Sequence, residues 1–246
     1  MRIAHIPPMR VIISHTTRLI AVLILAALVP ARSTGEMHPT PPLEGRSPVT
    51  GIADVTDGDT VVINGTRIRL EGIDAPEAGQ VCGTRAGGSW PCGASAATAL
   101  RRFIEGKAVR CDPLGIDRYG RMLGACFLGE VDVNALMVRR GHAWAFVRYS
   151  ESYAREEQEA RAERVGIWQG EALPAWEYRA RRWAGVEQRA PNGCAIKGNV
   201  TANGKIYHMP WSPWYARIRM DPARGRRWFC TEAEALAAGW RPVNLN

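Results

Sequence analysis

An Asn64-Gly65 dipeptide between two short strand-like runs is the feature that most constrains the fold of this chain. Residues 59–63 are mostly apolar, and residues 66–70 alternate between polar and apolar, as in a strand with one buried face. Asn-Gly favours the two-residue turn of a β-hairpin. The sequence therefore predicts an antiparallel hairpin in which Arg69 lies on the face opposite the apolar residues.

Later segments predict further elements of both kinds. The helices expected from apolar spacing span 94–105, 131–140 and 151–164. Two more strands, 109–111 and 123–128, flank a turn at 117–120. This order of strands, helix, hairpin and two helices indicates an α+β fold, in which helices pack on a small closed barrel.

The first 33 residues have the pattern of a secretory signal peptide. They contain four arginines, no acidic residue and an 11-residue apolar core at 19–29, which Pro30 and small residues follow. An uncleaved anchor is the alternative, and Met9 is a possible true start. No apolar run reaches the roughly 18–20 residues of a spanning helix, so we expect no membrane span after cleavage.

The mature chain divides by composition. We expect a linker at 34–49, a barrel domain at 50–170, a helical strap or linker at 171–190 and a small C-terminal module at 191–246. Residues 34–189 hold 20 Lys and Arg against 21 Asp and Glu, whereas residues 190–246 hold eight against three. The basic excess therefore lies in the C-terminal module, as a tether for a polyanion or as a solvated face of a structural appendage.

Two carboxylates, Asp59 and Asp74, each stand at the edge of an expected strand. If they meet, they repel unless a cation joins them, and oxygen ligands without Cys or His favour a hard ion such as calcium. Arg69 and Arg121 supply two guanidinium groups of the kind that bind a phosphodiester. Glu77 is a further carboxylate that can orient or deprotonate water.

In order and spacing, four segments resemble the staphylococcal nuclease family. They are Asp57-Gly58-Asp59-Thr60, residues 69–77, Asp117-Arg118-Tyr119-Gly120-Arg121 and Gly166-Ile167-Trp168. The resemblance covers roughly residues 50–168 and implies a five-stranded OB-type β-barrel with three packed helices, a fold that recurs in nucleic-acid binders. The C-terminal module resembles a small Cys- and Trp-containing module of some exported bacterial proteins.

The resemblance implies a role for each matching residue. The implied calcium ligands are Asp59, Asp74 and the backbone carbonyl of Ala75. The implied catalytic residues are Arg69, Glu77 and Arg121. Tyr119 matches a tyrosine that lines the nucleotide site. The family's second tyrosine has no clear counterpart, because Phe146, Val147 and Tyr149 compete for its place, and the family's flexible loop is replaced by residues 78–93.

Six cysteines follow the leader, and an even number in an exported chain indicates disulfide bonds. Cys111 and Cys126 lie almost symmetrically about the turn, so they should face each other on paired strands. The expected pairs are Cys82–Cys92, Cys111–Cys126 and Cys194–Cys230. This is one of 15 possible connectivities.

These observations predict an exported, calcium-dependent nuclease, periplasmic or secreted and monomeric, that hydrolyses phosphodiester bonds of DNA and/or RNA. The alternative is a catalytically weak nuclease-like protein that binds nucleic acid or an anionic envelope polymer. Degenerate binding copies commonly lack a carboxylate or an arginine of the site. All five charged residues are present here, which favours the enzyme.

Overall fold

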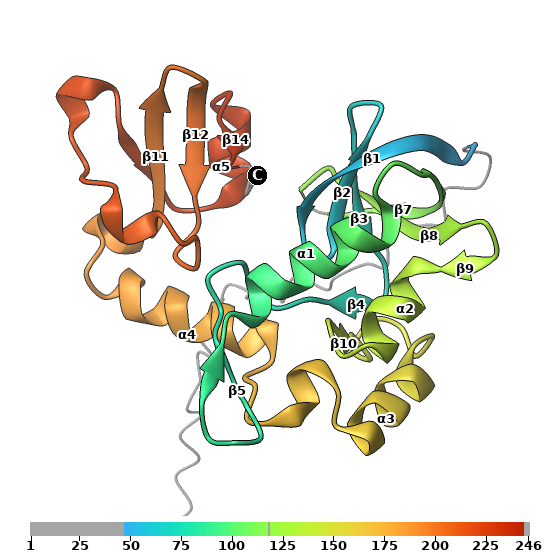
Figure 1. Ribbon diagram of the computed structural model, residues 1–246. Coiled ribbons are helices and arrows are strands. Elements are labelled where there is room, and N and C mark those ends of the chain that lie inside the picture. Colours follow the sequence, from blue (N-terminus) through green and yellow to red (C-terminus); the bar gives the residue numbers. More distant parts are fainter. Residues whose placement is uncertain (1–46, 118, 244–246) are drawn as a thin grey trace, which may run out of the picture. The chain divides into compact units, whose positions relative to one another are not determined.

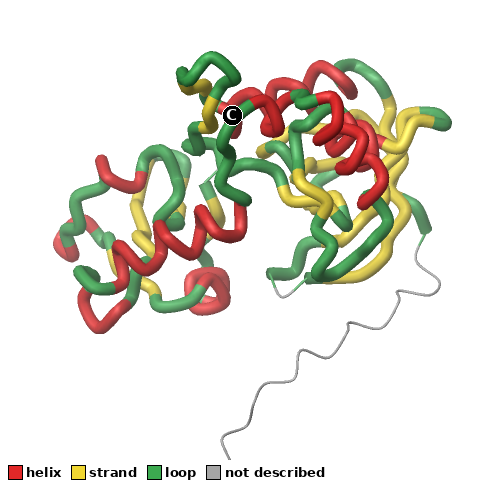
Figure 2. Tube along the Cα trace, turned by 90° about the horizontal axis from the view of Figure 1, so that it is seen from below, coloured by secondary structure: helices red, strands yellow, loops and turns green. Residues whose placement is uncertain are grey.

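The computed structural model describes residues 47–117 and 119–243 (Figures 1 and 2). The expected signal peptide, 1–33, and most of the expected linker, 34–49, lie outside these residues. Among the helices that are described, none has the length and apolar character needed to cross a membrane.

Five strands close a mixed β-barrel. They are β1 (Val49–Asp57), β2 (Thr60–Ile63), β3 (Thr66–Leu70), β7 (Ala108–Ile116) and β8 (Met122–Leu128). Neighbours in the order β3-β2-β1-β7-β8 are antiparallel, and a parallel pairing of β3 with β8 completes the circle. The turn between β2 and β3 is Asn64-Gly65, and both residues have positive φ. The expected hairpin and the OB-type α+β barrel are therefore confirmed.

Three helices accompany the barrel (Figure 1). They are α1 (Cys92–Ile104), α2 (Val133–Arg139) and α3 (Ala154–Glu163). The prediction of a helix from residue 131 is wrong at its start, because Val131–Asp132 form strand β9 beside β8. Asp132 ends this strand and caps α2, since its side chain accepts a hydrogen bond from the Ala135 amide at 2.9 Å. Strands β4 (Ile73–Asp74) and β10 (Trp144–Ala145) pair with each other.

A fully buried asparagine connects the barrel to α2. The Asn134 carboxamide accepts from the Cys126 amide at 3.2 Å and donates to the carbonyls of Glu71, at 2.9 Å, and Gly124, at 3.1 Å. A buried amide whose hydrogen bonds are made fixes the backbone around it. Asn134 therefore holds the turn after β3 against β8.

The segment 78–93 forms a small hairpin of β5 (Cys82–Gly83) and β6 (Ser89–Trp90). Its disulfide lies in a second apolar cluster, which contains Trp144, Ile167, a short 3₁₀ turn (Gly166–Gln169) and the start of α4 (Ala175–Glu187). Trp176 of α4 contacts Trp144 edge to face, with ring centroids 6.1 Å apart. The first half of the expected strap is thus a helix packed on the barrel domain.

The C-terminal module has its own sheet and core. Its strands are β11 (Ile196–Thr201), β12 (Gly204–His208), β13 (Arg227–Phe229) and β14 (Arg241–Pro242), in the order β13-β11-β12-β14. Helix α5 (Glu232–Ala237) and three 3₁₀ turns, Pro191–Gly193, Tyr215–Arg217 and Pro222–Arg224, complete it. The core contains Tyr207, Phe229 and Trp240, and Trp183 from the second half of α4 packs against it.

The structure contains the three expected disulfides, Cys82–Cys92, Cys111–Cys126 and Cys194–Cys230. Cys111 and Cys126 are direct partners in the β7–β8 register, with Cα atoms 4.0 Å apart. Both are buried in the barrel core.

Replacing Cys111 and Cys126 together by alanine should lower the free energy of unfolding by about 3 kcal/mol, because the bond closes a loop of 15 residues in the unfolded chain. Urea unfolding of the oxidised protein and the double variant measures the difference. Non-reducing peptide mapping is the control: two free thiols in the native protein would contradict the pairing.

The stability of the C-terminal module should fall in weak acid because of His208. Burial lowers the pKa of this imidazole from 6.5 to about 4 in the folded protein. The unfolded chain therefore binds a proton between these values, so the neutral imidazole's contribution is present above pH 6.5 and is lost toward pH 4. The loss is about 3 kcal/mol.

We expect the unfolding free-energy difference between the native protein and His208→Gln to shrink as pH falls from 7 to 4.5. Urea unfolding at several pH values measures it. A difference that stays constant over this range would show that His208 is not held neutral.

Candidate functional site

The turn between β1 and β2 brings Asp59 against the end of β4. A Cβ atom on Gly58 would lie 2.7 Å from the Cβ of Ala75, so only glycine allows this approach. The Asp59 carboxylate then accepts a hydrogen bond from the Ala75 amide at 2.9 Å. Asp57, which the sequence analysis did not assign to the site, accepts from the Asp59 amide at 3.1 Å. The turn therefore places two carboxylates beside the segment that follows Asp74.

Arg69 bridges the two expected metal ligands. Its Nη1 lies 2.7 Å from Asp59 Oδ1, and its Nη2 lies 2.8 Å from Asp74 Oδ1. The side chain of Asp74 is 0% exposed and that of Asp59 only 7%. Buried carboxylates need a partner of opposite charge, and a guanidinium supplies it here.

Glu77 is held in place by its backbone. Its amide donates to the Gln80 side chain at 3.1 Å, and Gln80 in turn donates to the Leu173 carbonyl at 2.5 Å, just before α4. The first turn of α1 lies so close that a Cβ on Gly93 would be 1.7 Å from the Glu77 carbonyl oxygen. Gln80 and the first turn of α1, which flank the Cys82–Cys92 loop, thus fix the backbone of Glu77.

A second arginine, Arg179 of α4, reaches the same carboxylates. Its Nη1 lies 2.7 Å from Glu77 Oε1 and 3.1 Å from Asp74 Oδ1, and its Nη2 lies 2.8 Å from Asp74 Oδ2. The sequence analysis missed this residue, because it treated 171–189 as a strap. The available signal was helical spacing: Arg179 follows the half-buried Trp176 by three residues, and so shares its face.

The turn that carries Arg121 is organised by Asp117. One oxygen of Asp117 accepts from the amides of Tyr119 and Arg121, both at 2.9 Å, and the other lies 2.7 Å from Arg121 Nε. The Arg121 guanidinium also lies over the Tyr119 ring, 5.4 Å from its centroid. Within the described residues Arg121 pairs with Asp117 and not with Asp59, but its positive charge helps to lower the pKa of the Asp59 carboxyl.

The carboxyl groups of the site differ in acidity. Burial raises the pKa of Glu77 to about 7, although Arg179 opposes this rise. Burial and the neighbouring Asp59 raise the pKa of Asp57 to about 6. Burial alone would also raise the pKa of Asp59, but Arg69 and a backbone N–H hold it below its ordinary value. Near neutral pH, Glu77 is therefore able to take up a proton while Asp59 stays charged.

Of the three candidates for a second site tyrosine, Phe146 contacts helix α4. Its ring stacks on Trp176 with centroids 5.4 Å apart, and the tilted Tyr149 ring lies against it with centroids 4.7 Å apart. Val147 and Tyr149 are more than half exposed. Phe146 thus helps to anchor the helix that carries Arg179.

The donor set fits a hard divalent cation by its chemistry. Asp57, Asp59, Asp74, Glu77 and the Ala75 carbonyl offer only oxygen atoms, as calcium prefers. Within residues 47–117 and 119–243, however, no three His, Cys, Asp or Glu side chains are grouped as a ready metal site. The reason is visible in the contacts, because the arginines occupy oxygens that would face an ion.

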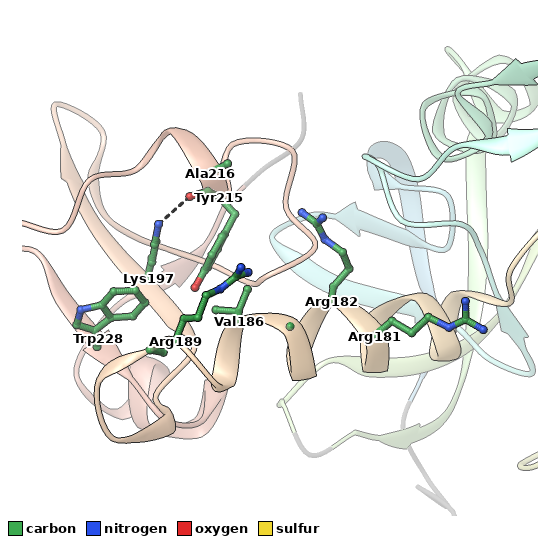
Figure 3. A pocket seen from close by; sticks show the side chains of 10 residues that line it. Arg181, Arg182, Val186, Arg189, Lys197, Tyr215, Ala216 and Trp228 are labelled. Atoms are coloured by element: carbon green, nitrogen blue, oxygen red, sulfur yellow. Dashed lines mark hydrogen bonds between the residues drawn. The ribbon is translucent and has the colours of Figure 1, made fainter.

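The second half of α4 and the C-terminal module line a separate, open cavity of about 430 Å³ (Figure 3). Its polar lining comes from Arg181, Arg182, Arg189 and Lys197, and its aromatic lining from Tyr215 and Trp228. Figure 3 shows Lys197 between the two aromatic side chains, with Arg189 beside them, whereas Arg181 extends away. The Lys197 amine lies 4.4 Å from the Tyr215 ring centroid.

Comparisons with known proteins agree with this geometry. Residues 67–170 match the family described as staphylococcal nuclease homologues, and residues 180–242 match a family described as ArfC. The succinoglycan biosynthesis protein ExoI of Rhizobium meliloti (strain 1021) is 36% identical over 172 residues, which is 69% of this chain and 85% of that protein.

Two further relatives carry nuclease names. An uncharacterized endonuclease of Escherichia coli O157:H7 is 33% identical over 139 residues, 53% of this chain and 84% of that protein. The probable staphylococcal-like nuclease CAN2 of Oryza sativa subsp. japonica is 35% identical over 124 residues, 49% of this chain but 31% of that protein. By its barrel, its charged site and these similarities, the chain belongs to the family of staphylococcal nuclease homologues.

Proposed function

We propose that this protein is an exported, calcium-dependent nuclease that hydrolyses phosphodiester bonds of DNA and/or RNA. The observation that carries the proposal is a single charged network, in which Arg69 joins Asp59 to Asp74 and Arg179 joins Asp74 to Glu77. Membership of the nuclease family supports nucleic acid as the substrate. Three disulfides support export, because such bonds persist in oxidising compartments.

In this proposal the carboxylates of Asp59 and Asp74 and the carbonyl of Ala75 hold the metal. When bound, calcium supplies Lewis-acid polarisation of a phosphoryl oxygen. The protein keeps these ligands in place through the Ala75 amide, which hydrogen-bonds Asp59, and through the β4–β10 pairing, which includes Asp74.

The arginines and Glu77 complete the chemistry. Arg69 and Arg121 bind the non-bridging phosphate oxygens, where negative charge increases in the transition state. Arg121 is held in advance by Asp117, so little ordering is needed when substrate arrives. Glu77, with its pKa near 7, accepts the proton of the attacking water.

Removing one carboxylate should abolish most activity without unfolding the protein. We expect Asp59→Asn to lower turnover of single-stranded DNA at saturating calcium by at least about 100-fold, because the negative charge that attracts the calcium ion is lost. Asp54→Asn is the matched control, since Asp54 is an exposed residue on the same hairpin. Turnover is measured with and without chelator, and circular dichroism verifies folding.

Full activity of the native protein in chelator would refute the calcium requirement. Unchanged turnover in Asp59→Asn would refute the assignment of Asp59. A protein with no cleavage under any of these conditions would instead support the alternative, a binding protein on a nuclease fold.

We also propose that the C-terminal module retains polyanions through the cavity beside α4. Among the described carboxylates, none forms an ion pair with Arg182, Arg189 or Lys197. Arg182 donates to the Pro210 carbonyl, and Lys197 donates to the carbonyls of Tyr215 and Ile218, so their positive charges are not neutralised by an acidic partner. Another basic cluster is partly neutralised, since Arg224 lies 3.3 Å from Asp221 and Arg227 lies 3.6 Å from Glu234. The relative ExoI is named for succinoglycan biosynthesis, which makes an acidic polysaccharide a second ligand to test.

Two double variants with equal charge loss test this proposal. Arg182→Gln with Arg189→Gln should weaken binding of long single-stranded DNA and lower the slope of log affinity against log salt by about 1 to 2. Arg224→Gln with Arg227→Gln should change both less, because these arginines already have acidic partners. Filter binding across a salt series measures the effect.

Cleavage of a short oligonucleotide should be the same in both double variants. Equal binding losses in the two variants would show that the cavity has no special role. If the first variant loses binding of an acidic polysaccharide but keeps binding of DNA, the ligand of the module is a saccharide and not DNA.

A further inference from the structure

We propose that Arg179 closes the metal site of this nuclease: its guanidinium occupies Asp74 and Glu77, and calcium binds only by displacing it. This inference rests on the calcium-dependent function proposed above. It adds a residue from outside residues 67–170, the part of the chain that matches the nuclease family.

The contacts of Arg179 cover the oxygens that a metal needs. Its two terminal nitrogens lie 3.1 and 2.8 Å from the two oxygens of Asp74, and one also lies 2.7 Å from Glu77. Arg69 also contacts Asp74, with its Nη2 2.8 Å from Oδ1. Both oxygens of Asp74 are therefore engaged by cations, and its charge is already compensated.

A divalent ion cannot be added to this arrangement without a change. It would place two further positive charges beside two guanidinium groups in a site with little water, where like charges repel strongly. One arginine must therefore leave Asp74 when calcium binds.

Arg179 can leave Asp74 at a lower free-energy cost than Arg69 can. Arg69 lies on a barrel strand and contacts Asp59, Asp74 and the Ile73 carbonyl, with its side chain 16% exposed. Arg179 is 24% exposed, and its hydrogen bonds in the described structure go to Asp74 and Glu77 alone. Its long side chain can turn to solvent while the barrel stays unchanged.

The backbone of α4 is fixed, so displacement is a movement of one side chain. Trp176, one turn before Arg179, packs on Trp144 and stacks on Phe146. Just before the helix, the Leu173 carbonyl accepts the hydrogen bond from Gln80. The helix thus holds the Arg179 guanidinium at the site as a built-in competitor, which raises the calcium concentration that the enzyme needs.

Calcium affinity tests the competition directly. Calcium chloride is titrated calorimetrically into metal-free native protein, Arg179→Gln and Arg181→Gln. We expect Arg179→Gln to bind calcium at least about tenfold more tightly than the native protein. Arg181→Gln should match the native protein, because Arg181 lies on the same helix but its side chain is 71% exposed and, among the described carboxylates, pairs with Glu177 at 3.8 Å and not with Asp74 or Glu77.

A second readout is thermal stability without metal. Arg179→Gln should unfold at a lower temperature than the native protein in chelator, since Asp74 and Glu77 lose a partner, and calcium should raise its midpoint more. If this variant does not fold, Arg179→Lys takes its place: it keeps the charge but loses the two-pronged contact, and should bind calcium several-fold more tightly than the native protein.

Equal or weaker calcium affinity in the folded Arg179 variant would overturn the competition and leave the nuclease proposal standing. Absence of calcium binding in all proteins would overturn both the competition and the calcium mechanism. Tighter binding in Arg181→Gln as well would show a general charge effect and would also overturn the specific role of Arg179.

Discussion

The burial of Asp74 is the constraint on which the rest of the site depends. Its side chain is 0% exposed, and a carboxylate without water is stable only with cationic partners. Arg69 reaches it from β3 and Arg179 from α4, so the barrel and the following helix must meet at this one group. The β4–β10 pairing and the Asn134 hydrogen bonds keep the intervening backbone in the required position.

Helix α4 connects the two parts of the chain that match different protein families. Trp176 packs in the cluster beside the nuclease barrel, and Trp183 packs in the core of the C-terminal module. Arg179 lies between these two anchors in sequence and contacts Asp74 and Glu77. The segment that follows the nuclease match therefore contributes to the candidate site as well as to the second module, and its removal would affect both.

The sequence predicted local features well where short-range chemistry decides them. The Asn64-Gly65 turn, the barrel and the opposed Cys111 and Cys126 follow from turn preference, alternation and symmetric spacing. Arg179 could not be predicted in the same way, because its partners are about a hundred residues earlier in the chain. Helical spacing could place Arg179 on the same face as Trp176, but no local pattern shows what a helix face meets.

The central claim is that the buried Asp74 exchanges the Arg179 guanidinium for calcium. The most direct measurement is a crystal structure of the protein grown with calcium, with anomalous diffraction to identify the ion. The account predicts calcium bound by Asp59, Asp74 and the Ala75 carbonyl, with Arg179 turned away from Asp74. Calcium bound elsewhere, or Arg179 still joined to Asp74 and Glu77 at saturating calcium, would contradict it.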